Sequence, residues 1–501
     1  MIECGLALIF TLIVHFARYR FGIVLSDEGF LWNGTLRIAQ GDVPIRDYKS
    51  YDPGRFYWSW AWMKVFGQGL YGLRRAVAVF QFLGIWAGLT AIATVTDSPL
   101  ALAVVAVLLA LWMVPQHKIF DNSFSLFHVL AFTWLFQSPS STTAILVGAA
   151  TGLGGVFGRN HAAYGIAASG MSFLLLLTKC AMDDPLVLAM FWVLGLIIGY
   201  GPLLIMFATV RGMARSYWHT KIMVFFHRRS VNLAKSAPWP WRQNNKGLPL
   251  LDRASHLAIG WYFVALPLFL LVAILWAFLS DQGLNTPALA AGSVVGLMYF
   301  HHATSRSDAP HLCQVMAPFL VAIAAAIFAS RGPVVETLLI GILGLTGWLV
   351  VRRVDVSLQY LENPTRFSEI TVLGEKLTLP TPTAKIVDNV VDLIETHVPP
   401  TDKIFLAPMS AAFYPILRKQ TPTFSDFLHF PETEANQSRI ISDLETNGVD
   451  WALIQNFPLD KRDELMFEVT HPDVWAYLHS HFEQIEYKNL SQQWTFWHRR
   501  P

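Results

Sequence analysis

The chain has 501 residues, of which 53% are hydrophobic and 14% are charged, and its mean hydropathy is +0.41. This composition excludes an ordinary soluble globular protein. The net charge of +2 identifies no partner, and the three cysteines, Cys4, Cys180 and Cys313, are too scattered to indicate a metal site or a disulfide framework.

Long apolar runs recur along the first 351 residues, and several approach the ~20 residues that a bilayer-spanning helix needs. Unbroken runs favour helices over a membrane β-barrel, in which apolar and polar residues would alternate. We therefore predict a polytopic α-helical membrane domain over residues 1–351. The runs predict about eleven spans, near residues 1–17, 76–96, 99–115, 124–137, 143–158, 162–180, 185–210, 257–279, 286–302, 310–329 and 333–351.

A long polar loop, residues 18–75, follows the first run and soon reaches two adjacent acids, Asp27 and Glu28. Paired carboxylates at a membrane edge indicate either a solvated helix end or a functional site, because hydrocarbon does not accept them unpaired. Further along, residues 55–66 combine three tryptophans with two basic residues, a composition typical of a helix in the lipid headgroup layer.

Two short polar turns between later spans hold further candidates. Asp121, which follows Lys118, is either a second carboxylate of the same site or the N-cap of the next helix. Arg159, two residues before His161, interrupts two apolar stretches. At membrane depth an arginine should face a cavity or an anionic partner such as a lipid phosphate, and the alternative is an arginine that snorkels from a helix end.

The second long loop, residues 211–256, carries an excess of positive charge that favours contact with anionic headgroups. Its single acid is Asp252. Its nine basic residues are Arg211, Arg215, Lys221, Arg228, Arg229, Lys235, Arg242, Lys246 and Arg253.

A polar group follows the span near residues 286–302. It consists of His301, His302, Arg306, Asp308 and His311. An arginine with neighbouring histidine donors at the start of a helix favours phosphate recognition. The alternative is a metal site, but the group lacks the histidine pair at i, i+4 and the glutamate of a zinc protease.

The tail, residues 352–501, has the composition of a soluble domain, and its pattern predicts a small α/β fold. The predicted helices cover residues 384–397, 436–447 and 472–484, and the predicted strands cover residues 403–407, 451–455, 485–488 and 493–498.

The succession of features in the first loop resembles the first extracytoplasmic loop of the GT-C superfamily of membrane glycosyltransferases, which includes protein O-mannosyltransferases and lipid A aminoarabinose transferases. The shared order begins with the acidic pair and an amphipathic helix that ends at Gly41. A Tyr-x-Pro element at Tyr51, an interfacial helix, and a Phe-Gly pair at Phe66 before the second span complete it.

The resemblance implies transfer of a hexosyl or pentosyl group from a polyprenyl-phosphate donor to an acceptor hydroxyl. That hydroxyl must lose a proton, which a positioned carboxylate can take, and cations must meet the departing phosphate. Asp27 is the expected base, with Glu28 and Asp121 as the other catalytic carboxylates. The expected donor phosphate-binding residues are Arg159, His161, Arg306 and His311. The expected substrate-loop residues are Tyr51, Arg55, Lys118 and Asp308.

Two arguments about orientation conflict. The positive-inside rule places the loops 18–75 and 211–256 in the cytoplasm, whereas the resemblance implies that they and the tail face outside it. We adopt the second orientation, in a bacterial inner (plasma) membrane. We expect the lipid-linked donor, membrane lipids and an acceptor that is a glycan, lipid or protein as partners, with no metal, no other cofactor and no nucleic acid.

A transporter or flippase of lipid-linked intermediates is the rival interpretation, in which the arginines line a path. Transporters usually place ionisable groups near the midplane and show inverted repeats, and neither feature is apparent in this sequence. By the predicted span count, the polar loops and the tail fall on one face of the membrane, which favours an enzyme that works at that surface.

Overall fold

The computed structural model describes residues 1–182, 184–223, 233–330, 332–487 and 493–501, and these form two compact units. The first unit comprises Met1–Tyr19, Arg74–Arg211 and Asn232–Gln359, and the second comprises Arg20–Leu73, Gly212–Val231 and Tyr360–Pro501. The first polar loop thus packs with the tail in one unit. This division does not follow the single boundary at residue 351 that composition predicts.

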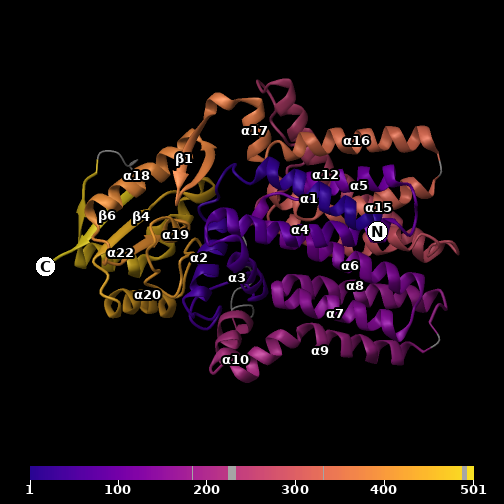
Figure 1. The fold of residues 1–501 in the computed structure, drawn as a ribbon, viewed down its shortest axis with the longest axis horizontal. Coiled ribbons are helices and arrows are strands. Elements are labelled where there is room, and N and C mark those ends of the chain that lie inside the picture. The colour runs from indigo at the N-terminus through magenta and orange to yellow at the C-terminus, as the bar shows by residue number, and fades with distance from the viewer. Residues whose placement is uncertain (183, 224–232, 331, 488–492) are drawn as a thin grey trace. The chain divides into compact units, whose positions relative to one another are not determined.

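Helices build the first unit (Figure 1). They are α1 (Ile2–Arg18), α4 (Leu70–Ile92), α5 (Pro99–Trp112), η1 (Gln116–Lys118), α6 (Ile119–Gln137), α7 (Ser141–Phe157), α8 (Arg159–Thr178), α9 (Pro185–Thr209), α12 (Leu250–Leu279), α13 (Pro287–Ser305), α14 (Ala309–Cys313), α15 (Met316–Ala329), α16 (Pro333–Val351) and α17 (Val356–Glu362). Each predicted apolar run lies largely on one or more of these helices.

Fewer helices meet the length and composition expected of a membrane span than the eleven apolar runs predict. Among the described residues, five helices are long and apolar enough to cross a membrane, or six if the bent pair α16 and α17 counts as one span. Several other apolar helices are short: α5 has 14 residues and α7 has 17. A bilayer-spanning helix needs ~20 residues, so the count of about eleven spans remains a prediction.

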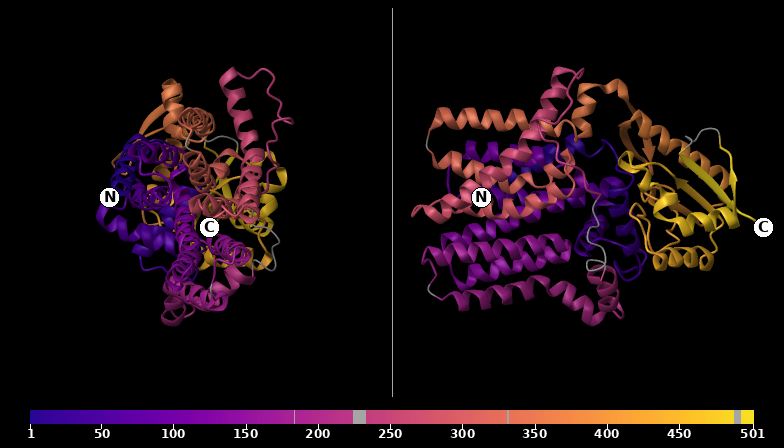
Figure 2. Two further views of the ribbon diagram at one scale, coloured as in Figure 1. Left: turned by 90° about the vertical axis from the view of Figure 1, so that its right-hand side faces the viewer. Right: turned by 180° about the vertical axis from the view of Figure 1, so that it is seen from behind.

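Helices α7 and α9 run side by side in close contact (Figures 1 and 2). Glycines make this approach possible because a Cβ atom at Gly148 would lie 2.1 Å from the carbonyl oxygen of Trp192, and one at Gly195 would lie 2.1 Å from that of Ile145. Small residues of this kind allow helix backbones to approach in membranes, where packing replaces the hydrophobic effect as the driving force.

The end of α1 is held by a buried arginine. The Arg18 Nε atom lies 2.6 Å from Asp355 Oδ2, and its terminal nitrogens donate to the carbonyls of Ala110 and Leu111 at 2.9 and 3.0 Å. Those carbonyls stand in the last turn of α5, where no intrahelical donor remains for them. Arg18 therefore joins three segments of the unit and satisfies an open helix end.

The second unit combines the loop helices with an α/β domain. Its loop helices are α2 (Asp27–Ala39), α3 (Gly54–Phe66), α10 (Met213–Tyr217) and η2 (Trp218–Met223). Its tail contains η3 (Pro364–Arg366), β1 (Phe367–Val372), β2 (Glu375–Pro380), α18 (Thr381–His397), β3 (Ile404–Ala407), α19 (Phe413–Ile416), α20 (Glu434–Thr446), β4 (Trp451–Gln455), η4 (Leu459–Lys461), η5 (Asp463–Leu465), α21 (Phe467–Thr470), α22 (Pro472–His481), β5 (Phe482–Ile485) and β6 (Trp494–Arg499).

The main sheet has the strand order β3-β4-β6-β5, in which β3 and β4 are parallel and the other pairs are antiparallel. Side chains of α20 and α22 pack into a core with one face of this sheet, and α18 covers the other face through His397 and Phe496 (Figure 1). The sequence placed β3, β4 and β6 to within a residue at each end. It placed β5 wrongly at 485–488, because α22 ends at His481; residue 488 itself lies outside the described residues.

The sequence missed the hairpin of β1 and β2. Leu373 and Gly374 turn between the strands with positive φ angles of 50° and 84°. The start of the first polar loop extends this hairpin, since Thr378 donates its N–H to the Arg20 carbonyl at 2.8 Å and accepts from the Gly22 N–H at 3.0 Å. The loop and the tail are therefore parts of one hydrogen-bonded structure.

We predict that Gly195→Leu destabilises the packing of α7 against α9. A leucine side chain would collide with the backbone of Ile145, and overpacking of this kind typically lowers the free energy of unfolding by about 1–3 kcal/mol. The midpoint of thermal unfolding of the detergent-purified protein measures the effect. Gly201→Leu is the matched control on the same helix, because a Cβ atom there meets nothing within 4 Å. Equal midpoints for the two variants would contradict the proposed packing.

Candidate active site

The acidic pair forms the first turn of α2 in the second unit. Asp27 is half-buried, and its Oδ1 atom lies 3.4 Å from the Tyr51 hydroxyl. Glu28 is only 3% exposed and accepts the Val24 N–H at 3.3 Å. Acids at a helix N-terminus are favoured by the helix dipole, so this position stabilises both carboxylates in their charged form.

Two predicted substrate-loop residues lie beside Asp27. The Arg55 guanidinium stacks on the Tyr51 ring, with 4.9 Å from its carbon to the ring centroid. Arg55 is buried, on the first turn of α3. The structure therefore brings Asp27, Tyr51 and Arg55 together, and it gives Glu28 a partner in the backbone of its own loop.

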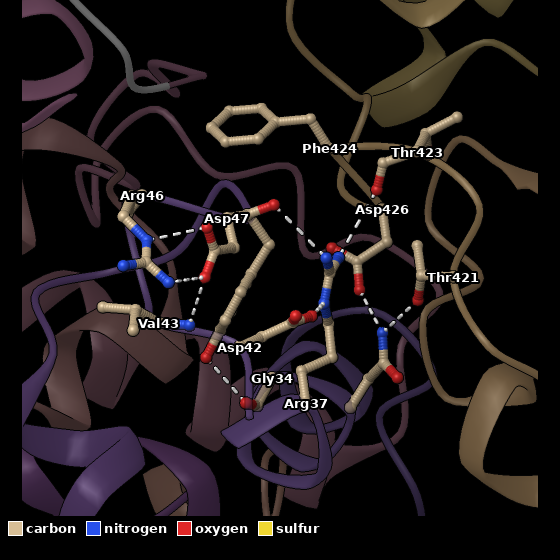
Figure 3. Close-up of polar contacts among 12 residues, drawn as sticks. Gly34, Arg37, Asp42, Val43, Arg46, Asp47, Thr421, Thr423, Phe424 and Asp426 are labelled. Carbon is tan, nitrogen blue, oxygen red and sulfur yellow. Dashed lines mark hydrogen bonds and ion pairs between the residues drawn. The ribbon is translucent and has the colours of Figure 1, made fainter. Parts of the chain in front are cut away.

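The helix that carries the acids is fixed against the tail. A Cβ atom at Gly29 would lie 2.3 Å from the backbone nitrogen of Ala412, which donates to the Leu25 carbonyl at 3.0 Å. One turn further along, the Asn33 side-chain amide donates to Thr421 Oγ1 at 2.8 Å and to the Asp426 carboxylate at 2.5 Å (Figure 3).

Charged groups complete this junction of loop and tail. The Arg37 guanidinium pairs with Asp42 at 2.7 Å and reaches the Asp47 and Thr423 carbonyls at 3.3 and 3.4 Å (Figure 3). Asp47 in turn pairs with Arg46 at 2.7 Å. The tail therefore determines the orientation of the helix that begins with Asp27.

The first unit holds a second polar cluster. Asp121, near the start of α6, has its Oδ1 atom 3.1 Å from His161 Nε2 at the start of α8, although the angle falls short of a good hydrogen bond. Helix α6 begins at Ile119, with Lys118 at the N-cap position, so Asp121 is not the N-cap of this helix. Lys118, Asp121 and His311 all lie close enough to His302 to interact with it electrostatically.

The predicted phosphate ligands after α13 are held by Asp308. Its carboxylate lies 3.1 Å from Arg306 Nε and 2.6 Å from His311 Nδ1, and it also caps α14 by accepting the His311 N–H. Burial alone would raise the pKa of Asp308, but the hydrogen bonds from His311 and the charge of Arg306 hold it below its usual value of 3.8. Lys235 of the basic loop lies 3.8 Å away.

The remaining predicted ligands differ in their settings. Arg159 is the exposed first residue of α8, whereas His161 is buried two residues later. Arg228 and Arg229 of the basic loop lie outside the described residues. No group of three or more His, Cys, Asp or Glu residues suited to a metal ion occurs in the described part of the chain.

Sequence reasoning missed Tyr299, His128 and Tyr164. The Tyr299 hydroxyl lies 3.2 Å from the Nδ1 atoms of both His161 and His128, and the Tyr164 hydroxyl lies 3.1 Å from His301 Nδ1. A signal was available for His128, because it stands in the middle of an apolar helix where an ionisable residue indicates function.

An apolar cavity of about 430 Å³ adjoins this cluster. Its lining comes from α6, α7 and α9: Phe124, Phe127, Leu130, Ala131, Trp134, Leu146, Ala149, Ala150, Leu153, Ile198, Gly199 and Pro202. Phe124 connects the cavity with the polar cluster, because its ring also stacks on His161 at 5.1 Å between centroids.

We predict that Asp426→Asn makes the stability of the protein against unfolding less sensitive to rising pH. Burial raises the pKa of Asp426 above its usual 3.8, so folding favours the protonated carboxyl. Its contribution to stability is present below that usual value and is lost as the pH rises through the raised pKa. Relative to the wild type, the unfolding midpoint of Asp426→Asn should therefore rise as the pH increases above the usual 3.8 of an aspartate. Asp388→Asn, at an exposed site on α18, is the control. If the difference in unfolding midpoint between Asp426→Asn and the wild type did not change with pH, this account would be contradicted.

Comparison with known proteins gives matches in structure only. No family model matches the chain, and no curated protein matches it by sequence. The apo structure of ArnT from Cupriavidus metallidurans matches with a TM-score of 0.53 and 15% identity over 99% of this chain and 96% of that one. ArnT from the same organism bound to undecaprenyl phosphate matches with a TM-score of 0.50 and 16% identity over 99% and 97%.

The archaeal oligosaccharyltransferase AglB from Archaeoglobus fulgidus, in complex with an inhibitory peptide and a dolichol-phosphate, matches with a TM-score of 0.46 and 12% identity over 96% of this chain and 72% of that one. ArnT is a lipid A aminoarabinose transferase of the GT-C superfamily. The likeness to ArnT extends over nearly the whole length of both chains, which confirms the resemblance seen in the first loop at the level of the fold: the chain has the GT-C membrane fold.

Proposed function

We propose that this protein is a glycosyltransferase that moves a hexosyl or pentosyl group from a polyprenyl-phosphate donor to an acceptor hydroxyl at the extracytoplasmic face of a bacterial inner membrane. The observation that carries the proposal is the full-length likeness to ArnT, which has been seen bound to undecaprenyl phosphate. Fold alone does not determine function, so the residues of the two polar clusters must supply the chemistry.

The cationic cluster of the first unit is suited to the donor phosphate. Arg306, His311 and Lys235 gather around one carboxylate, that of Asp308. In this role a phosphate oxygen would take the place of the carboxylate at one or more of these donors. The planar carboxylate and the tetrahedral phosphate are both oxyanions that charged donors recognise. Arg159 and His161 would add donors from the start of α8. No divalent cation is needed in this arrangement.

The apolar cavity beside His161 suits the lipid part of the same donor. Its walls are apolar, and Phe124 stands between them and His161. A polyprenyl chain there would extend from a phosphate held at the cluster, which would bind head and tail of the donor on one unit.

Asp27 is the proposed base. Asp27 is a half-buried carboxylate at the start of a helix, where the helix dipole favours an acid, and the Tyr51 hydroxyl lies beside it. It would take the proton of the acceptor hydroxyl as the new glycosidic bond forms and the bond from the sugar to the phosphate breaks. Glu28, which is buried and bonded to its own loop, would support the shape of this turn, and Asp121 would act with His161 at the donor.

We predict that Asp27→Asn and Arg306→Ala fail in different ways. Asp27→Asn keeps the side-chain shape and removes the basic oxygen, so turnover should fall by ~10²-fold or more while undecaprenyl phosphate still binds. Arg306→Ala should weaken binding of undecaprenyl phosphate because it removes a charged donor. Transfer and lipid binding by the purified protein measure both effects, with excess EDTA present to test the independence from metal.

The controls decide between the interpretations. Asp388→Asn, a distant exposed acid, should leave both measurements unchanged. Near-normal turnover by Asp27→Asn would remove Asp27 from the mechanism. A flippase would instead show lipid movement between leaflets in liposomes and no sugar transfer by the wild type.

We predict that the first polar loop, the basic loop and the tail face outside the cytoplasm. In a protein without its native cysteines, single cysteines at the exposed positions Gln40, Asn244 and Asn436 should react with an impermeant thiol reagent in intact cells. In a second protein that keeps Cys180 as its one cysteine, this exposed residue between α8 and α9 should react only after permeabilisation, because it lies at the opposite end of a predicted span. The reverse pattern would show that the positive-inside rule determines the orientation.

A further inference from the structure

A chain of buried polar side chains extends from Asp121 into the helical unit. It passes from Asp121 through His161 and Tyr299 to His128, and it joins α6, α8 and α13. Tyr299 is 2% exposed and His128 is fully buried. Polar side chains at this depth in apolar helices are costly, so they indicate function more often than packing.

The hydrogen-bonding capacity of Tyr299 limits how these groups can be protonated. One hydroxyl lies 3.2 Å from two imidazole Nδ1 atoms, but it has a single proton to donate. It must therefore donate to one histidine and accept an N–H from the other. Where each imidazole carries one proton, the two histidines are therefore held in opposite tautomers.

The carboxylate of Asp121 selects between the two arrangements. If Tyr299 donates to His161 Nδ1, a singly protonated His161 has its proton on Nε2, which lies 3.1 Å from Asp121 Oδ1 and gains electrostatically from the carboxylate even though the angle is poor for a hydrogen bond. In the other arrangement a lone pair of Nε2 would face the carboxylate, and the two would repel. His128 then carries its proton on Nδ1, beside the Tyr299 oxygen, and its ring also has a hydrogen bond with the backbone of Phe124.

The surroundings of His128 fit this arrangement. Within the described residues its Nε2 atom has no hydrogen-bond partner, as expected for an atom that carries a lone pair and no proton in an apolar setting. Space for the ring comes from Gly165 of α8, where a Cβ atom would lie 2.7 Å from His128 Nε2. The absence of a side chain at Gly165 therefore leaves room for the imidazole ring of His128.

We propose that Tyr299 and His128 are positioning residues that fix His161 in the Nε2-protonated tautomer, so that its N–H faces Asp121 and the donor phosphate. The part of this role that concerns the donor rests on the proposed function. The tautomer itself does not, because it follows from hydrogen bonding within the first unit.

Nitrogen NMR of ¹⁵N-histidine-labelled protein in lipid nanodiscs tests the proposal without any substrate. His161→Asn identifies the signals of His161. In the wild type these signals should show a protonated Nε2 and a hydrogen-bonded, unprotonated Nδ1. In Tyr299→Phe, which keeps the ring and deletes the hydroxyl, they should shift to a mixture of tautomers. Tyr164→Phe is the matched control, because that ring packs 4.8 Å from Tyr299 but its hydroxyl contacts His301.

Two results would overturn the proposal: a wild-type His161 protonated at Nδ1, or an unchanged tautomer in Tyr299→Phe. The first result is available even if Tyr299→Phe does not fold. Binding of undecaprenyl phosphate should be roughly fivefold weaker in Tyr299→Phe and unchanged in Tyr164→Phe. If the wild type binds no undecaprenyl phosphate, the proposed function is contradicted. The tautomer of His161 is still tested independently by NMR.

Discussion

Hydrocarbon accepts neither an unpaired charge nor an open backbone group, and this constraint arranges the first unit. Charged residues of its long helices stand near helix ends, as Arg74 does in α4, Arg159 in α8 and Asp252 in α12. Helix α9, Pro185–Thr209, contains no charged residue at all. His128 of α6 lies deeper, and Tyr299 of the neighbouring helix α13 supplies its partner. The same constraint concentrates the charged groups of these helices at helix ends.

The sequence predicted those elements whose signal is local. Apolar runs predicted the helices of the first unit, and the short runs at β3 and β4 predicted strands in the tail, because the signal lies within each segment. The hairpin of β1 and β2 is local and was overlooked, whereas its extension by the Arg20–Gly22 segment was not predictable, because that segment is distant in sequence and meets Thr378 only in the fold. Apolarity alone leaves the number of spans a prediction, since α5 and α7 are apolar but shorter than a typical bilayer-spanning helix.

The candidate site shows the same division. Residue type and position in a polar turn were enough to propose Asp27, Asp121 and Arg306 as candidates, because charged residues stand out against the apolar runs around them. Which of them meet was not predictable: the structure pairs Asp121 with His161, and it makes Asp308 the common partner of Arg306 and His311. Tyr299 escaped notice because an aromatic residue within an apolar run reads as core, and only its two histidine contacts distinguish it. Pairing across helices is a property of packing, which a single sequence does not display.

The position of the acidic pair depends on residues almost four hundred positions away, since Asn33 of α2 bonds to Asp426. Gly29 brings the helix against the backbone at Ala412, and a larger residue there would move the helix away. A carboxylate that acts as a base must be held within a fraction of an ångström of its productive position. The segment around Asp426 is therefore as much a part of the frame of Asp27 as the loop that carries it. The tail and α2 belong to one unit, and their contact fixes the direction in which the first turn of that helix presents its acids.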